Sequence, residues 1–259
     1  MNQFAQPNDS ENAPCHGGQR FEDCAHCHVR RLAICGALEP AELEPMARLV
    51  THKRLAKGDQ LFEENAAADH VYTLTSGAMR LCKLLPDGRR QIIGFALPGD
   101  FLGLTASQRY FYSAESIAET TLCRFKQSDL AVLFRLFPHL QDRLLRMTSG
   151  ELAAAQDQML SLGRKEPVER VASFLASLAR RMRRFGDPGP TVTLPMTRAD
   201  IADYLGLTIE TISRSFTKLK SARIIVLPSP ERVFVADPAR LAALARGEAA
   251  QSGPGHGSE

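Results

Sequence analysis

The stretch from Thr197 to Ile225 constrains the fold most strongly, because it predicts two short amphipathic helices joined by a tight turn. Thr197 can cap the first helix together with Asp200 at the third helical position. Gly206 is of the residue type that ends helices, and Thr208 can cap the second helix. Apolar residues at helical spacing predict the two buried faces: Ile201, Ala202 and Leu205, then Ile212, Phe216 and Leu219.

The polar residues of the second helix gather on the face opposite its apolar residues. Four of them fall within an arc of about 100° at roughly 100° per residue: Glu210, Ser213, Arg214 and Thr217. An arginine can donate two hydrogen bonds to guanine, and a glutamate can accept one from cytosine. A solvent-exposed ion pair between Glu210 and Arg214 is the alternative that involves no DNA. The layout predicts a helix-turn-helix with a recognition helix.

Charge is distributed unevenly along the 259 residues. Residues 163–246 hold 15 Lys and Arg against 8 Asp and Glu, a net charge of +7, so the rest of the chain carries −4 of the overall +3. The basic part contains the predicted recognition helix, as binding to a phosphate backbone requires. The N-terminus is polar, and no apolar run approaches the roughly 20 residues that span a bilayer. We therefore expect a cytoplasmic protein with no membrane partner.

Four cysteines lie within 21 residues near the N-terminus: Cys15, Cys24, Cys27 and Cys35. Six cysteines in a chain without an export signal indicate metal or redox chemistry rather than disulfides. The C-x2-C pair suits a zinc ion or an iron–sulfur cluster, and the spacing alone leaves both open. Reduced thiols without any ligand are the remaining alternative. Cys82 and Cys123 each lie in a strand-like run, where a lone cysteine is usually a small core residue.

Short strand-like runs broken by glycine turns occupy about residues 38–127. Gly77, Gly88 and Gly99 are 11 residues apart, a spacing typical of hairpins in an antiparallel roll or barrel. The runs beside them, VYTLT, MRLCKLL and RQIIGFAL, have strand propensity. We predict a β-roll sensor domain over residues 37–137.

The longest helical stretch follows, over residues 138–164. Its apolar residues step by three and four positions, and we call the following six residues the heptad stripe: Leu145, Thr148, Leu152, Ala155, Met159 and Leu162. Packing of this helix on its own β-roll is the simpler alternative. The narrow stripe, with small residues at 148 and 155, favours close approach of an identical helix. We therefore predict a dimerisation helix and a homodimer.

The remaining segments complete an α+β chain. Glu166-Pro167 predicts the start of a further helix, and residues 186–196 a turn-rich connection with a short strand. Residues 224–237 predict a wing of two strands around a turn at 228–231. The predicted domains are a cysteine-rich segment (1–36), the β-roll (37–137), the dimerisation helix (138–164), a winged helix-turn-helix (165–246) and a tail (247–259). We expect the tail and residues 1–14 to be disordered.

This order of parts resembles the FNR/CRP superfamily of bacterial transcription regulators over roughly residues 24–240. The specific motif is E-x-x-S-R, here Glu210, Ser213 and Arg214, within PMTRADIADYLGLTIETISR. The match is closer to the FNR–FixK branch, and to its FnrN and FnrL subgroup, than to the cyclic-nucleotide branch. The resemblance implies a β-roll of the cyclic-nucleotide-binding type, a jelly roll, ahead of the dimerisation helix and the winged helix-turn-helix.

The same resemblance implies the partners of the chain. It implies an oxygen-responsive activator that binds TTGAT-like palindromes in double-stranded DNA as a homodimer and contacts RNA polymerase. The residues implied at the DNA are Thr208, Glu210, Thr211, Ser213 and Arg214, with base contacts from the three motif residues.

The resemblance also gives the cysteines a role. FNR proteins bind a [4Fe–4S] cluster through three N-terminal cysteines and a distant one near the end of the β-roll. The matching residues here are Cys24, Cys27, Cys35 and Cys123, the last within AETTLC, while Cys15 is left out. The chain departs from the best-known pattern in having seven rather than five residues before the third ligand. Such a cluster would tie the cysteine segment to the roll and so set the start of the dimerisation helix.

Two alternatives to this function remain. The first is the same DNA-binding regulator with a zinc or thiol-redox site at the N-terminal cysteines. The second is a cyclic-nucleotide-binding module. Cyclic-AMP receptors hold the phosphate with an Arg-Ser or Arg-Thr pair, but Tyr112-Ser113 stands at that place here and Arg109 is out of step. A cyclic phosphate would therefore lack its bidentate partner. No catalytic arrangement suggests an enzyme.

Overall fold

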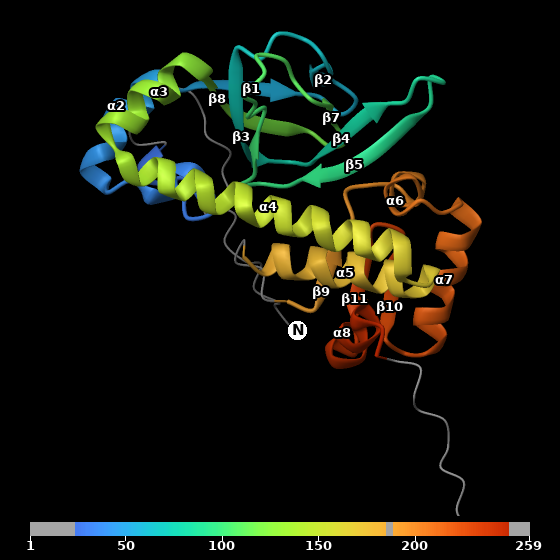
Figure 1. Cartoon of the computed structure of the whole chain (residues 1–259). Coiled ribbons are helices and arrows are strands. Elements are labelled where there is room, and N and C mark those ends of the chain that lie inside the picture. Colours follow the sequence, from blue (N-terminus) through green and yellow to red (C-terminus); the bar gives the residue numbers. More distant parts are fainter. Residues whose placement is uncertain (1–23, 185–188, 249–259) are drawn as a thin grey trace, which may run out of the picture. The chain divides into compact units, whose positions relative to one another are not determined.

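The computed structural model describes residues 24–184 and 189–248 (Figure 1). The boundary between two compact units lies between Thr148 and Ser149, within helix α4 (Pro138–Arg164). The expectations for residues 1–14, for Cys15 and for residues 249–259 of the predicted tail lie outside the described residues. In the part of the chain that is described, no helix is long and apolar enough to cross a membrane.

The first unit contains two four-stranded antiparallel sheets that form a jelly roll (Figure 1). The strands of one sheet, in spatial order, are β1 (Thr51–Leu55), β8 (Thr120–Lys126), β3 (His70–Ser76) and β6 (Phe101–Leu102). Those of the other are β2 (Gln60–Phe62), β7 (Ser113–Ser116), β4 (Met79–Leu84) and β5 (Arg90–Ala96). Strands β3, β4 and β5 occupy the three runs in which strands were predicted.

The evenly spaced glycines do not all close hairpins, so that part of the prediction was wrong. Gly88 lies in the turn between β4 and β5, which are paired. Gly77 and Gly99 lie instead between strands of different sheets, because the chain of a roll must pass from one sheet to the other. Gly77 has φ +83°, and a Cβ there would clash with the Glu119 carbonyl oxygen. The corner therefore requires glycine.

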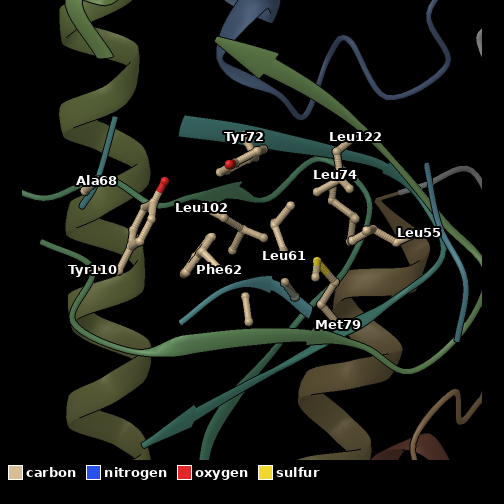
Figure 2. Close-up of a cluster of buried hydrophobic side chains, with 12 residues drawn as sticks. Leu55, Leu61, Phe62, Ala68, Tyr72, Leu74, Met79, Leu102, Tyr110 and Leu122 are labelled. Carbon is tan, nitrogen blue, oxygen red and sulfur yellow. The ribbon is translucent and has the colours of Figure 1, made fainter. Parts of the chain in front are cut away.

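Aromatic and aliphatic side chains from both sheets fill the interior of the roll (Figure 2). The Phe62 ring stacks on Tyr110 with 3.9 Å between centroids and lies 5.8 Å from Tyr72. The Tyr110 hydroxyl donates to the His70 carbonyl oxygen at 2.8 Å, so this buried phenol has its hydrogen-bond partner.

Short helices that the sequence did not predict cover one end of the roll. They are η1 (Ile34–Ala37), η2 (Pro40–Glu42), α2 (Leu43–Leu49) and α3 (Gln127–Leu136). Together with the first turns of α4 they form a second apolar core, which includes Ile34, Leu43, Leu133 and Leu140. The cysteine segment and the start of α4 therefore share one core.

The second unit contains the helix-turn-helix and a three-stranded sheet of order β10-β11-β9. Its elements are α5 (Pro167–Arg183), β9 (Thr191–Thr193), α6 (Arg198–Leu205), α7 (Ile209–Ser221), β10 (Ile225–Ser229), β11 (Arg232–Val235) and α8 (Pro238–Arg246). Pro167 occupies the first turn of α5, as predicted, and Glu166 caps it.

Two details of this unit differ from the expectation. The turn of the wing is Pro230-Glu231 rather than residues 228–231, because Pro228 and Ser229 belong to β10. Helix α8 was not predicted; the Asp237 side chain caps it by accepting from the Arg240 N–H at 2.9 Å. Helix α8 has nine residues, and only Leu241 among them is buried. One buried position gives no apolar periodicity from which the helix could be recognised in the sequence.

Candidate functional site

The helix-turn-helix has the capping that its sequence predicted. The Thr197 hydroxyl accepts from the Asp200 N–H at 3.1 Å, and the Asp200 carboxylate accepts from the Thr197 N–H at 3.0 Å. Gly206 ends α6 with φ +61°. The Thr208 hydroxyl accepts from the Thr211 N–H at 3.2 Å and caps α7. The local hydrogen bonds thus define where both helices begin.

The packing between α6 and α7 places the recognition helix. The predicted apolar faces of both helices are buried: Ile201, Ala202, Leu205, Ile212, Phe216 and Leu219. Sequence reasoning missed Arg198, whose guanidinium lies 3.3 Å from the centroid of the Phe216 ring. Burial lowers the pKa of Arg198 to about 10, so the cation persists at neutral pH. No local pattern marks this contact, because it joins two helices.

The opposite face of α7 is exposed along its predicted DNA-contacting residues. Glu210, Ser213, Arg214 and Thr217 are exposed, whereas Thr211 is partly buried. The Ser213 hydroxyl donates to the Ile209 carbonyl oxygen at 2.9 Å, and its oxygen can still accept a hydrogen bond from outside. The face therefore offers an arginine donor, a carboxylate acceptor and hydroxyl oxygens at the N-terminal half of the helix.

The pKa of Glu210 is lowered mainly by hydrogen bonds at the N-terminal end of α7 rather than by the charge of Arg214. Hydrogen bonds from its own backbone N–H and from the Thr208 side chain lower the pKa of Glu210. The charge of Arg214 is the last of the contributions that lower it. Hydrogen bonding at the helix end therefore lowers the pKa of Glu210 more than Arg214 does, and both side chains are exposed.

The four cysteines matched by the resemblance line one pocket in the first unit, with an internal volume of about 20 Å³. They come from two distant parts of the chain: Cys24, Cys27 and Cys35 from the N-terminal segment and Cys123 from β8. The rest of the wall is largely apolar: Val29, Ala33, Leu43, Met46, Val50 and Phe125, with His52, Thr73 and Thr75.

Strand register places Cys123 at this pocket. In the sheet, Cys123 lies opposite His52 of β1 on one side and opposite Thr73 of β3 on the other. Directly opposed residues of antiparallel strands point to the same face, so all three side chains face the pocket. The strand pattern alone had suggested a core residue, yet Cys123 is only partly buried. Cys82, in β4 of the other sheet, is buried and is not among the lining residues.

The chemistry of the pocket fits a group bound through sulfur. Burial, and then the nearby Cys24, raise the pKa of Cys35 to about 11, so a metal must displace the proton of this thiol. The Thr73 hydroxyl oxygen is buried without a hydrogen-bond partner among the described residues. Within those same residues, no three His, Cys, Asp or Glu side chains are arranged to hold one metal ion.

The cysteine segment is attached to the start of α4 by hydrogen bonds as well as by packing. The Arg143 guanidinium donates to the carbonyl oxygens of Arg31 and Leu32, both at 2.9 Å. The His139 Nε2 lies 3.1 Å from the Glu42 Oε2 of η2. A displacement of the cysteine segment would therefore act directly on the first turns of α4. Arg143 has no signal in the local sequence, since its partners are backbone oxygens far away in the chain.

Tyr112 and Ser113, at the position of the phosphate-binding Arg-Ser pair of cyclic-AMP receptors, make hydrogen bonds within the roll. The Ser113 hydroxyl accepts from the Glu64 N–H at 2.9 Å, and the Tyr112 hydroxyl accepts from the Gly103 N–H at 3.3 Å. Beside them the Arg80 Nε donates to a Glu115 carboxylate oxygen at 3.1 Å. The stacked rings of Phe62, Tyr72 and Tyr110 lie in the interior of the same roll (Figure 2).

Most of the heptad stripe is exposed in the single chain. Leu145, Leu152 and Met159 are 65%, 61% and 63% exposed, whereas Leu140 and Leu144 on another face of α4 are buried. The C-terminal end of the stripe differs, since Leu162 is 38% exposed and its Cδ2 lies 3.6 Å from where a Cβ at Gly206 would stand. The helix does not bury this stripe within either unit, which leaves it available to a partner.

Comparison with known proteins identifies the two folded parts. The family model of the Crp-like helix-turn-helix domain matches residues 169–244, and that of the cyclic nucleotide-binding domain matches residues 52–136. The chain is 51% identical over 231 residues to the transcriptional activatory protein AadR of Rhodopseudomonas palustris, covering 89% of this chain and 95% of that protein.

Two FixK proteins extend the comparison. The nitrogen fixation regulation protein FixK of Bradyrhizobium diazoefficiens is 43% identical over 222 residues, covering 86% of this chain and 93% of FixK. The solved structure of FixK2 from Bradyrhizobium japonicum superimposes with a TM-score of 0.70 at 38% identity, covering 75% of this chain and 96% of FixK2. These proteins are regulators rather than enzymes. The chain belongs to the FNR/CRP family of DNA-binding transcription regulators, in its FNR–FixK branch.

Proposed function

We propose that the protein is an oxygen-responsive activator that binds palindromic, TTGAT-like DNA as a homodimer. In this proposal Cys24, Cys27, Cys35 and Cys123 hold a [4Fe–4S] cluster. The observation that carries it is the convergence of these four thiols, from two distant segments, on one largely apolar pocket. The interior of the roll is packed with aromatic side chains, which argues against the cyclic-nucleotide alternative. In this proposal the protein acts on DNA in the cytoplasm, and RNA polymerase is a further partner.

The residues of the chain supply the coupling. When bound, the cluster provides an oxygen-labile link between Cys123 and the three cysteines of the N-terminal segment. Arg143 binds the N-terminal segment by hydrogen bonds, and Ile34 of that segment packs in one core with Leu140 of α4. A movement of the segment would therefore move the first turns of α4. The exposed heptad stripe then pairs with its copy in a second chain. Dimer formation would place two α7 helices about one DNA turn, roughly 34 Å, apart in successive major grooves.

At the DNA, the motif residues have different tasks. Arg214 is suited to a guanine, and Glu210, kept ionised at the helix end, to a cytosine amino group. The Ser213 oxygen can accept a hydrogen bond from a base amino group while its hydroxyl continues to donate to the Ile209 carbonyl oxygen. Thr208 and Thr211, which form the cap of α7, lie where a phosphate would approach the helix N-terminus.

Protein isolated without air is expected to contain iron and acid-labile sulfide in equal amounts, about four of each per chain for a [4Fe–4S] cluster. Exposure to air should remove the visible absorption of the cluster and lower the affinity for DNA. Metal and sulfide analysis on the same sample measures this. A colourless protein containing zinc and no iron would instead establish the zinc alternative and leave only the DNA-binding part of the proposal.

Arg214→Ala is expected to reduce discrimination between a TTGAT-like site and random DNA by about 1–3 kcal/mol, the worth of a bidentate contact to guanine. Binding titrations to both DNAs at several salt concentrations measure the effect. Lys218→Ala is the matched control, because Lys218 is also exposed on α7 one turn later. We expect Lys218→Ala to lower the affinity for both DNAs by the same factor and to reduce the salt dependence of binding. If Arg214→Ala lowers the affinity for both DNAs equally, Arg214 contacts a phosphate rather than a base.

A further inference from the structure

The hydroxyl of Thr73 is an unusual feature of the cysteine pocket. Thr73 lies in the middle of β3, its residue is 4% exposed, and its Oγ1 has no hydrogen-bond partner among the described residues. A buried hydroxyl without a partner is unfavourable compared with a methyl group of the same shape. Folding alone gives no reason for threonine rather than valine at this position.

The direction of this side chain follows from the sheet. Thr73 is directly opposite Cys123 in the β3–β8 pairing, so both side chains leave the same face, and both line the pocket with Cys24, Cys27 and Cys35. Strand β3 thus presents to the cysteine pocket, directly opposite Cys123, a hydroxyl that has no hydrogen-bond partner among the described residues.

The neighbouring threonine shows that the missing partner is specific to Thr73. Thr75 also lines the pocket and is 2% exposed, but its Oγ1 lies 2.7 Å from the Thr121 Oγ1. These two buried threonines of β3 both line the pocket but differ in hydrogen bonding: the Thr75 hydroxyl has a partner within the protein and the Thr73 hydroxyl has none among the described residues.

We infer that the Thr73 hydroxyl donates a hydrogen bond to a sulfur of the group bound by the four cysteines, and thereby tunes its reduction potential. The inference rests on the proposed iron–sulfur site. A hydroxyl donor stabilises negative charge on a cluster sulfide or on the Cys123 thiolate, and the reduced state carries more of that charge. Thr73 therefore raises the reduction potential and makes the cluster harder to oxidise. It sets the sensitivity to oxygen without being a ligand.

Thr73→Val tests this in the full-length protein, because valine keeps the shape and removes only the hydroxyl. In the cluster-free protein we expect an unchanged or higher melting temperature, since an unpaired buried hydroxyl has been removed. In the protein loaded without air we expect a more negative midpoint potential and a shorter half-life of the cluster in air. Thr73→Ser, which keeps the donor, should restore the potential towards that of the wild type.

Thr75→Val is the matched control. It should lower the melting temperature of the cluster-free protein, because a satisfied hydrogen bond is lost, and leave the potential unchanged. A Thr73→Val protein with the wild-type potential and half-life would overturn the inference, as would a Thr75→Val protein with the same shift. A wild-type chain that binds no iron and sulfide would overturn the proposed site together with this inference, whereas the preceding outcomes would overturn the inference alone.

Discussion

Cys123→Ser is expected to abolish assembly of the iron–sulfur cluster, so that protein purified without air contains little or no iron and sulfide. Cys123 is the one proposed ligand on the β-roll, and the other three lie in the N-terminal segment. Serine is a hard oxygen donor with a high pKa, and it is a much poorer ligand than a thiolate for the iron of a cluster. The loss should also remove the link between the cysteine segment and β8, and with it high affinity for the palindromic DNA.

Cys82→Ser is the control for this experiment. Cys82 is 5% exposed in β4 of the opposite sheet and does not line the pocket, so its replacement should leave iron content and the visible spectrum unchanged. Burial of the new hydroxyl should cost stability, by about 1–3 kcal/mol if it finds no partner, which thermal unfolding measures. Iron retained by Cys123→Ser, or lost by Cys82→Ser, would show that the proposed ligand set is wrong.

Leu152→Glu is expected to convert the protein to monomers and to remove nearly all specific DNA binding. Leu152 lies near the middle of the heptad stripe and is 61% exposed in the single chain, so the change should not disturb the folded monomer. In a symmetric dimer each copy would bring a carboxylate to the same buried position. An uncompensated buried charge costs about 3–5 kcal/mol, which weakens the dimer by roughly 100-fold or more.

Sedimentation equilibrium on the protein loaded without air measures the dimer, and titration with a palindromic site measures the loss of binding. Ala154→Glu is the control, because Ala154 is also exposed on α4 and is turned by about 200° from Leu152. It should dimerise like the wild type. If Leu152→Glu remains dimeric at the concentrations at which the wild type does, the heptad stripe is not the interface.

The sequence by itself determined the features that depend on neighbours a few positions away. The start of α6 follows from Thr197 and Asp200, its end from Gly206, and the start of α7 from Thr208. A cap hydrogen bond spans three residues, and an amphipathic face repeats every three or four, so both are encoded locally. For the same reason α4 could be predicted over Pro138–Arg164.

Features that depend on the register of distant segments appear only in the tertiary structure. Equal spacing could not show that Gly77 and Gly99 turn between two sheets while Gly88 closes a hairpin. The match to a family had pointed to Cys123, but its approach to the N-terminal cysteines required the folded sheet.

The same holds for the residues that act between elements. No periodic or compositional pattern in the sequence predicts three such contacts: Arg198 with Phe216, Arg143 with the carbonyl oxygens of the cysteine segment, and Thr73 opposite Cys123. Each joins residues far apart in the chain, and such pairs are specified by packing and strand register rather than by local propensity. The sequence alone therefore determined α6 and α7 of the helix-turn-helix, and the tertiary structure decided which side chains meet at the cysteine pocket.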